Sequence, residues 1–441
     1  MKNISGVLSI LIPMYNEGVD IRNTLTELVC RDLHERYKIV ICDDDSADHS
    51  LAEAQSIAQT HRNIVLVENR PNGKKIGAIK TGLLSVTTPY VLLLDADSGI
   101  IEITQCYLDA LVTKMQDQGI TAIGFKIRPP ATSLLEYLQT LEYLLFTDGL
   151  RRLLGIPVCL VGIGALWKVD DLKAILARHS GTFEGDDLEI TILATMLSFK
   201  IVYEAHGIFV TTKLKRNLGE LIRQRAYIWD VGLIRTLLDT RSILNVNWTG
   251  QDAAFFRGVF ITEVVAHPFK ILSLAGLLLV ALSILLGSLD FAPLLPKQTG
   301  NTSEYVLAVL TSTHCVYLLL WAINVVSICL SMKSRLRSVP LFILYFTFYM
   351  ATPIVSSVTS DFGQLLGFTY LWWYALCAFL IMLGTESPET KIRSLVLALL
   401  MPLYFALLFA LPRTVGFVRY ILGRMQGKYS KLKEVRRSPL K

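Results

Sequence analysis

Two carboxylates follow a short apolar run in the sequence, in the order 91–94, Asp95, Ala96 and Asp97. The run predicts a buried strand, and side chains at i and i+2 of a strand lie on the same face. Asp95 and Asp97 are therefore expected together at the carboxyl end of a strand, where open α/β sheets place their ligands. Carboxylate oxygens suit a hard divalent cation, which in turn suits a diphosphate. A strand that ends in a polar turn would give the same short pattern.

More charged residues follow other predicted strands and are expected close to this pair. They are Glu17, Asp44, Asp48 and Lys74. The carboxyl ends of parallel strands share one edge of a sheet, so residues distant in sequence converge there on one crevice. Asp44 could contact a base or a ribose hydroxyl, and Lys74, where a loop turns into a helix, could meet phosphate charge. Any one of them could instead cap a helix, and Asp48 is a good candidate for that.

A second group of acids consists of Glu184, Asp186, Asp187 and Glu189, just before a helix predicted over 190–197. The dipole at a helix start favours acids, which explains one or two of them rather than all. Crowded carboxylates raise one another's pKa, and a raised pKa suits a general base.

Two segments offer aromatic side chains for a sugar. In the first, small residues at 161–165 allow close backbone approach, and Trp167 is available to stack on a sugar ring. In the second, an amphipathic helix over 214–240 carries Arg225 and Trp229, which share a face because they are four residues apart. This pair could hold a pyrophosphate beside an acceptor sugar. A surface helix with snorkelling arginines is an equal competitor.

The elements that must position these residues alternate regularly. Strands are predicted over 8–13, 38–42, 63–67, 90–95 and 121–127, with helices between the first four. This alternation predicts a parallel, doubly wound α/β sheet. A further amphipathic helix over 132–154 is either a core helix or one that lies along a bilayer surface.

The composition predicts a membrane domain after the α/β domain. Hydrophobic residues make up 52% of the 441-residue chain, which is high for a soluble enzyme of this size. Apolar runs long enough to span a bilayer occur at 268–289, 305–331, 339–358, 364–384 and 394–412. The run 339–358 contains two prolines and is predicted to be interfacial or re-entrant, which leaves four spans. We therefore expect a soluble domain at 1–212, an interface helix at 213–250 and a transmembrane domain at 251–412.

Charge and cysteine usage limit the partners and the location of the soluble domain. The net charge of +6 comes largely from 413–441, with nine Lys or Arg against one acid, Glu434. Such a basic tail marks the cytosolic face of a membrane more simply than a nucleic-acid site. No signal peptide or leading span precedes the first strand, so the soluble domain is expected in the cytosol, at a cell or inner membrane. The seven scattered cysteines argue against structural zinc and a disulfide framework.

The ordered set of motifs resembles the family-2 membrane glycosyltransferases, which include cellulose, chitin, hyaluronan and poly-N-acetylglucosamine synthases. The matching segments, in the family's order, are 12–17, Asp44 with Ser46 and Asp48, Gly73-Lys74, Asp95-Ala96-Asp97, 162–165 and 185–187. Together they cover about residues 8–230. The resemblance implies a glycosyltransferase-A fold, which is a Rossmann-like α/β domain.

The resemblance also implies roles for individual residues. Asp44 would contact a uracil, Asp95 and Asp97 would bind Mg²⁺ or Mn²⁺ and the diphosphate, and Asp187, with Asp186 beside it, would be the general base. The other residues assigned to the donor are Pro13, Tyr15, Glu17, Lys74, Arg225 and Trp229. Those assigned to the acceptor are Gly164, Trp167 and Trp229.

Two departures from the family pattern bear on the product. The usual Asp-Gly-Ser is Asp44-Asp45-Ser46, and Gln-x-x-Arg-Trp is replaced by the sequence from Gln224 to Trp229, in which Arg and Trp are not adjacent. Either one residue is inserted and Trp229 keeps its role, or the acceptor site is rebuilt. Because this motif is associated with processive synthesis, the change bears on processivity more than on sugar transfer.

Three functions fit the sequence. The first is a membrane-embedded inverting glycosyltransferase that adds sugar from a UDP-sugar to a growing β-linked polysaccharide and translocates it. The second is an enzyme that adds one sugar to a lipid acceptor. The third is a transporter or anchor whose soluble domain binds nucleotide without chemistry, but the predicted spans carry few of the polar groups that transporters use.

Overall fold

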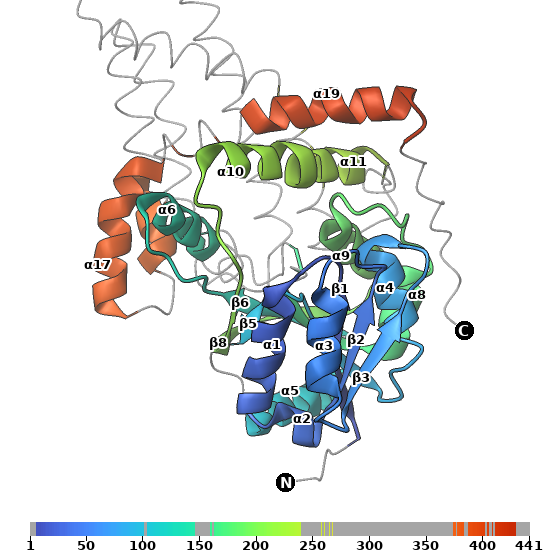
Figure 1. Ribbon diagram of the computed structural model, residues 1–441. Helices are drawn as coiled ribbons and strands as arrows, with labels where there is room; N and C mark the ends of the chain where they lie inside the picture. Colours follow the sequence, from blue (N-terminus) through green and yellow to red (C-terminus); the bar gives the residue numbers. More distant parts are fainter. Residues whose placement is uncertain are drawn as a thin grey trace, which may run out of the picture.

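The structure is a computed structural model that describes residues 6–100, 104–145, 159–160, 163–239, 374–375, 377–382, 387–401 and 411–428, with single residues at 257, 260, 264, 267, 404 and 408. In these ranges an α/β domain lies beneath a layer of helices (Figure 1).

The α/β domain is built on one eight-stranded sheet with the order β3-β2-β1-β4-β7-β6-β8-β5. The strands are β1 (Leu8–Met14), β2 (Lys38–Asp43), β3 (Ile64–Glu68), β4 (Tyr90–Leu94), β5 (Gly99–Ile100), β6 (Ala122–Ile127), β7 (Gly164–Lys168) and β8 (Ile201–Thr211). The first four strands are parallel, with Leu11 of β1 opposite Val40 on one side and Leu93 on the other. Their carboxyl ends therefore meet at one edge, as predicted.

The sheet is mixed, which corrects the prediction of a parallel sheet. β7 runs antiparallel to β4 and β6, and β5 runs antiparallel to β8. The sequence of β7 does not reveal its direction, because its residues are buried on both faces. Leu166 packs in the core on one side of the sheet, whereas Ala165 and Trp167 pack in the core on the other.

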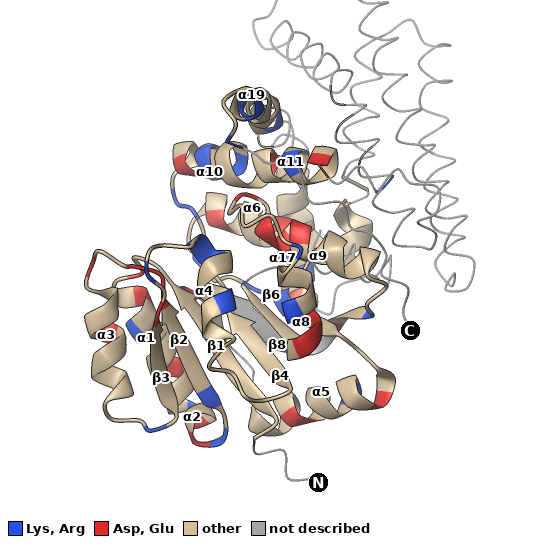
Figure 2. Ribbon diagram, turned by 90° about the vertical axis from the view of Figure 1, so that its right-hand side faces the viewer, with Lys and Arg blue, Asp and Glu red and all other residues tan. Residues whose placement is uncertain are grey.

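Helices cover both faces of the sheet (Figures 1 and 2). One core lies beneath α1 (Val19–Cys30), α3 (Ser50–Ala58) and α5 (Gln105–Gln118), with the short α2 (Leu33–Arg36) at its edge. The other core lies beneath α4 (Lys74–Gly82), α8 (Val169–Leu176) and α9 (Asp186–Met196). The helices predicted after the first three strands are thus present in the order expected.

A second layer of helices lies across the carboxyl edge of the sheet. α10 (Leu218–Gln224), the π-helix η2 (Arg225–Asp230) and α11 (Val231–Asp239) follow one another without a break. They form the described part of the interface helix predicted over 213–250. α6 (Leu134–Tyr143) is the described part of the helix predicted over 132–154, and Ser133 and Glu136 close a capping box at its start. Its Leu138 and Leu141 pack against protein, including Leu221 and the segments around 377–381 and 398–408.

The carboxyl-terminal part of the chain returns to this layer. α17 (Pro388–Leu397) and the short η5 (Ala398–Leu400) lie beside α6, and α19 (Leu411–Met425) packs on η2 and α11. The segment predicted as a basic tail thus begins as a packed helix. Its basic residues Arg413, Arg419 and Arg424 are separated by largely apolar stretches. Tyr420 joins Val231 and Ile234 in a small core.

None of the helices in the described ranges is both long and apolar enough to cross a bilayer. The spans predicted at 268–289, 305–331 and 339–358 lie outside the described residues, and those at 364–384 and 394–412 lie only partly within them. The transmembrane domain at 251–412 stays a prediction.

Candidate active site

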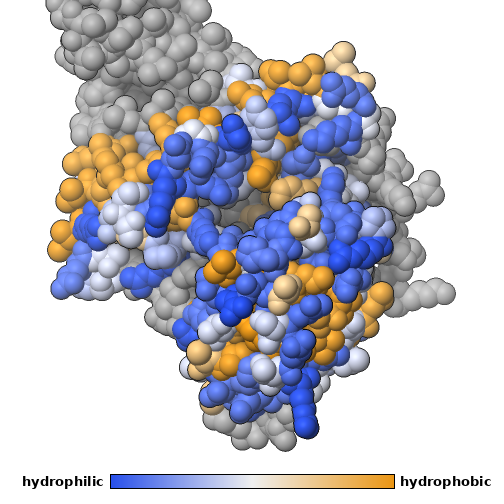
Figure 3. Space-filling view, in the orientation of Figure 1, coloured by the Kyte–Doolittle hydropathy of each residue, from blue (hydrophilic) through white to orange (hydrophobic). Residues whose placement is uncertain are grey.

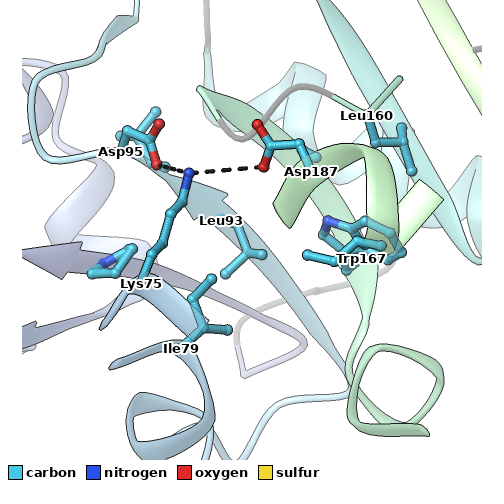
Figure 4. Close-up of a pocket in the computed structure, with 11 residues that line it drawn as sticks. Lys75, Ile79, Leu93, Asp95, Leu160, Trp167 and Asp187 are labelled. Atoms are coloured by element: carbon cyan, nitrogen blue, oxygen red, sulfur yellow. Dashed lines mark ion pairs between the residues drawn. The ribbon is translucent and has the colours of Figure 1, made fainter. Parts of the chain in front are cut away.

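A small cavity opens at the carboxyl end of the sheet, between β4 and the start of α9 (Figure 4). Its inner wall is apolar and includes Leu93 and Ile190, whereas Lys75, Asp95 and Asp187 bring charge to it. These three residues come from α4, the end of β4 and the first turn of α9. The fold thus gathers residues from three distant parts of the chain.

Lys75 joins the two groups of acids that the sequence singled out. Its Nζ lies 2.9 Å from Asp95 Oδ1, 3.8 Å from Asp187 Oδ1 and 3.9 Å from Asp186 Oδ2. Burial acts to lower the pKa of the Lys75 ammonium, but the charges of Asp187, Asp95 and Asp186 outweigh it and hold the pKa well above its ordinary value. Lys75 therefore stays charged and compensates part of the negative charge of the cavity.

The lysine that lines the cavity is Lys75, the neighbour of the predicted Lys74; the contact of Lys74 with a phosphate stays a prediction. Lys74 is the first residue of α4, with a φ of 60°, and its side chain is exposed. Lys75 and Ile79 are four residues apart on one face of α4, and both line the cavity. That i, i+4 spacing with an apolar residue is the sequence signal that could have identified Lys75.

Asp44 holds the loop that precedes α4. It is only 2% exposed, and its Oδ1 accepts hydrogen bonds from Asn69 Nδ2 at 2.6 Å and from the Gly73 amide at 2.8 Å. The Asn72 side chain donates to the Asp44 carbonyl at 2.7 Å. Asp44 thus fixes the entry to the helix that carries Lys75; the predicted contact with a uracil is not tested by this geometry.

Asp95 and Asp97 lie on a turn rather than on a strand, contrary to the prediction. β4 ends at Leu94, and the Ser98 amide donates to the Asp95 carbonyl at 3.1 Å, which closes a turn. The alternation of a strand therefore does not place these carboxylates. The two carboxylates are separated by one residue, and the negative charge of Asp97 is among the causes that raise the pKa of Asp95.

Glu17 belongs to the same acidic cluster. Burial, followed by the charges of Asp97, Asp20 and Asp95, raises the pKa of Glu17 to about 7. Burial also raises the pKa of Asp95 to about 6, although Lys75 opposes this, and it raises the pKa of Asp97. Each added negative charge is costly here, so the cluster would be stabilised by a cation.

The acidic cluster fits a divalent cation that is bound together with a diphosphate. Among the residues that the structure describes, no three His, Cys, Asp or Glu side chains form a cage for a metal ion. Mg²⁺ typically uses one or two carboxylates together with substrate phosphates and water rather than a cage made entirely of protein. Asp95 and Asp97 supply that number and type of ligand.

The four acids at the start of α9, of which Glu184 precedes the helix, have three different environments. Glu189 is 1% exposed and accepts from Ser180 and Arg235 inside the protein. Glu184 Oε1 pairs with Lys428 at 2.9 Å. Asp186 and Asp187 face Lys75, so the helix start uses one acid internally and leaves two for the cavity.

Asp186 and Asp187 differ in their accessibility. Asp186 is 8% exposed, its Oδ2 has no hydrogen-bond partner, and burial together with the charge of Asp187 raises its pKa well above its usual range. The Asp187 side chain is 28% exposed and lines the cavity. Asp187 is thus the carboxylate of the pair that a substrate can reach.

The segment from Gln224 to Trp229 lies in the π-helix η2, whose N-cap is Gln224. A π-helix closes its hydrogen bonds one residue later than an α-helix, so it accommodates one extra residue without breaking the helix. Arg225 Cζ lies 3.5 Å from the centroid of the Trp229 ring, which confirms that the two share a face. The Trp229 side chain remains 39% exposed.

Arg225 supports Trp229 instead of opening toward a donor. It is 4% exposed, and its Nη2 donates to Glu142 Oε2 at 2.7 Å. Tyr404 Oη donates to the same oxygen at 2.7 Å. In this arrangement the charge of Arg225 is matched by the buried carboxylate of Glu142, and its predicted role at a pyrophosphate stays a prediction.

Tyr143 is a site residue that the sequence did not reveal. Its ring lies edge-on to Trp229 with centroids 6.5 Å apart. Burial raises the pKa of Tyr143 to about 12, and the charges of Asp97 and Asp187 contribute to the shift. Nothing in the pattern of α6 distinguishes Tyr143 from the core positions around it.

Trp167 does not have the predicted role. It is 2% exposed and forms part of the core on the α4 side of the sheet, at the inner wall of the cavity. An indole that stacks on a sugar needs an accessible face, so the acceptor assignment is wrong. Gly164 begins the buried strand β7 opposite Leu94. Pro13 lines the cavity, whereas Tyr15 is 49% exposed and does not line it.

Residues 9–176 match the model for "Glycosyl transferase family 2". The chain is 24% identical over 225 residues to a poly-β-1,6-N-acetyl-D-glucosamine synthase of Staphylococcus epidermidis, a match that covers 49% of this chain and 52% of the relative. It is 33% identical over 99 residues to a dolichyl-phosphate β-glucosyltransferase of Dictyostelium discoideum, which covers 20% and 30%. The match spans about half the length of the synthase.

Among solved structures, the chain resembles the mannosyltransferase PcManGT from Pyrobaculum calidifontis in complex with GDP-Man and Mn²⁺. The TM-score is 0.42 at 16% identity, over 75% of this chain and 88% of that one. The family match and the synthase relatives confirm the resemblance that the sequence motifs indicated.

Proposed function

We propose, from the premise that residues 9–176 form a family-2 glycosyltransferase domain, that this chain transfers a sugar from a nucleotide-sugar donor to an acceptor hydroxyl with inversion. The observation that carries the proposal is the position of Lys75 between Asp95 and Asp187, at 2.9 and 3.8 Å. It brings a candidate metal ligand and a candidate base to the same cavity.

In the proposed reaction Asp187 is the general base. It accepts the proton of the acceptor hydroxyl while the hydroxyl oxygen attacks the anomeric carbon and the bond from that carbon to the diphosphate breaks. Asp95 and Asp97 are the residues that would hold Mg²⁺ or Mn²⁺, which when bound offsets the charge that develops on the departing diphosphate. Lys75, which lies near both Asp95 and Asp187, would keep these two carboxylates close to each other.

Trp229 is the proposed acceptor platform. Its ring is 39% exposed, is backed by the Arg225 guanidinium and lies near Tyr143. An aromatic ring offers a flat apolar surface to one face of a sugar. The π-helix supports the view that the one-residue insertion leaves this tryptophan in its role.

The donor is proposed to be a UDP-sugar and the product a β-linked polysaccharide. The relationship to poly-β-1,6-N-acetyl-D-glucosamine synthases, over about half of their length, supports a polymer over a single transfer to a lipid.

The chain is proposed to act at a cell membrane with its α/β domain in the cytosol. The apolar runs between 268 and 412 support this location. So do exposed apolar side chains on the outer helices, which Figure 3 shows gathered over α17 and α19. They include Ile392 and Val396 of α17 and Val418, Ile421 and Met425 of α19. Membrane lipid is accordingly a proposed partner.

A panel of radiolabelled UDP-sugars tests the proposal. Membranes containing the full chain are incubated with each donor and Mn²⁺, and free UDP and product size are measured. We expect one donor to give metal-dependent UDP release and a ladder of long products. A single short glycolipid would contradict the polymer, and no UDP release from any donor would contradict the transferase.

A further inference from the structure

Arg235 of α11 holds the turn that precedes the acid pair. Its Nε and Nη2 donate to the Glu184 carbonyl at 3.2 and 2.9 Å, and Nη2 also donates to Glu189 Oε2 at 2.8 Å. Its Nη1 donates to Ser180 Oγ at 3.2 Å. The Arg235 side chain thus contacts Ser180 and Glu184, which precede the pair Asp186-Asp187, and Glu189, which follows it.

Arg235 is suited to fix this turn rigidly. It is 1% exposed, as is Glu189, so the contacts are made away from competing water. The planar guanidinium presents several donors in a fixed geometry, which defines the position of its acceptors more closely than a single donor can.

A close backbone contact fixes the same turn at a second point. Gly185 has a φ of 75° and lies against Gly232, where a Cβ built on Gly232 would be 2.4 Å from the Gly185 nitrogen. Gly232 and Arg235 are three residues apart in α11 and therefore share a face of that helix. The turn at Glu184 and Gly185 thus contacts α11 twice, through the backbone of Gly232 and through the hydrogen bonds of Arg235.

The same continuous helix carries the proposed acceptor platform. Trp229 in η2 and Arg235 in α11 are six residues apart, which corresponds to about 9 Å along a helix axis. The residue that holds the turn before Asp187 and the proposed acceptor platform therefore lie on one continuous helix, although Asp187 itself lies at the start of α9. Asp95 and Asp97 lie outside this helix, after the end of β4.

We propose that Arg235 is a positioning residue that sets Asp187 relative to the acceptor bound at Trp229, an inference that rests on the proposed transfer reaction. Arg235 acts through the Glu184 carbonyl and Glu189 and does not contact the cavity itself. Its loss should impair the proton transfer step and leave donor binding unaffected, since misplacement of about 1 Å can cost on the order of 100-fold in rate.

The test compares Arg235→Met with the double variant Arg235→Met/Glu189→Gln. The single variant leaves the charge of Glu189 buried without Arg235, which destabilises the fold. It is therefore interpreted only together with the double variant. The double variant removes both charges and keeps a Gln that can still bond Ser180. Arg178→Met is the matched control. Arg178 lies just after α8, and its Nη1 donates to the Ala174 carbonyl of that helix at 2.8 Å.

Three quantities are measured for each variant of the full chain: kcat and KM for the best UDP-sugar, the Kd for UDP with Mn²⁺, and amide hydrogen exchange over 183–189. For the double variant we expect a kcat reduced about 10- to 100-fold, an unchanged Kd, and faster exchange in 183–189. The control should match the wild type in all three.

The outcomes separate this inference from the proposed function. A double variant that folds and regains the wild-type kcat would overturn it, because Arg235 would then only balance the charge of Glu189. A Kd that weakens in step with kcat would also overturn it. If the wild type releases no UDP, the proposed function fails, and unchanged exchange in 183–189 would by itself refute the anchoring role.

Discussion

Lys75 and Lys74 are adjacent in the sequence but face different surroundings, which makes them a matched pair. Lys75→Met removes the cation shared by Asp95, Asp186 and Asp187 and leaves their negative charges uncompensated. We expect transfer to fall by more than about tenfold, because loss of one partner of a buried charge cluster costs several kcal/mol. The rate of UDP release measures this.

The control is Lys74→Met, which removes an exposed cation of the same size. We expect nearly normal UDP release from it. Equal losses in the two variants would show that the cavity needs positive charge in general and not the contacts of Lys75.

Glu17 should make the ligand-free protein less stable as pH rises. In the folded chain its pKa is about 7, against an ordinary value of 4.5 when unfolded. Between these values the folded state binds more protons than the unfolded state, so stability is lost as pH rises through this window. Glu17→Gln removes that loss. The melting temperature of the variant minus that of the wild type should therefore be larger at pH 8 than at pH 5.

Glu220→Gln, a change at an exposed position of α10, should show no such pH-dependent difference. Parallel pH profiles for the wild type and Glu17→Gln would rule out a raised pKa at Glu17.

The sequence identified most of the site by residue type but not by exact position. Asp95 and Asp97 could be proposed because they follow an apolar run, and Asp187 because it belongs to a dense group of acids before a predicted helix. Lys75 was missed because the start of α4 has a positive φ at Lys74, which no local pattern specified. Trp167 was misassigned because neither its exposure nor the direction of its strand can be read from composition.

At the scale of elements, the contact between α9 and α11 determines where the acid pair lies. Gly232→Ala would bring a methyl group to 2.4 Å from the Gly185 nitrogen and 2.6 Å from its Cα. Backbone atoms cannot yield as a side chain can, so we expect a destabilisation of about 1–3 kcal/mol together with reduced transfer. Thermal unfolding and UDP release measure the two effects.

Gly219→Ala in α10 is the comparison, because its nearest neighbour is the Asn217 side chain at 3.1 Å. It should retain stability and activity. A fully active Gly232→Ala would contradict the role of this contact.

Elements in the first half of the chain were predictable because parallel strands and helices alternate there with clear periodicity. The strands β1, β2, β3 and β4 begin and end within one or two residues of the predicted ranges. The direction of β7 and the π-helix η2 were not predictable, since the first depends on contacts with distant strands and the second on an extra residue that only packing reveals. In the sequence, the only sign of that π-helix is that Arg and Trp are not adjacent between Gln224 and Trp229, unlike in the family's Gln-x-x-Arg-Trp motif.

At the scale of the whole molecule, α19 returns to the helix that carries Trp229. Arg413 pairs with Asp230 where both side chains are almost fully buried, at 6% and 5% exposure. Arg413→Met leaves Asp230 as a buried charge without this partner, and we expect a loss of about 3–5 kcal/mol. Chemical unfolding of the full chain measures it.

Lys428→Met is the matched control, three residues after the end of the same helix. The Lys428 side chain is 47% exposed where it pairs with Glu184, and exposed pairs contribute about 0–1 kcal/mol. Similar losses in the two variants would mean that α19 is not held on η2 by the buried pair.

Asp187 is proposed to be the base of a sugar transfer in which the donor is bound at Asp95 and Asp97. Its role is tested by comparing Asp187→Ala with the wild type in UDP release and in the Kd for UDP with Mn²⁺. We expect UDP release to fall about 100- to 10,000-fold, as for loss of a general base, with nearly unchanged UDP binding. Retained transfer by Asp187→Ala would contradict this role.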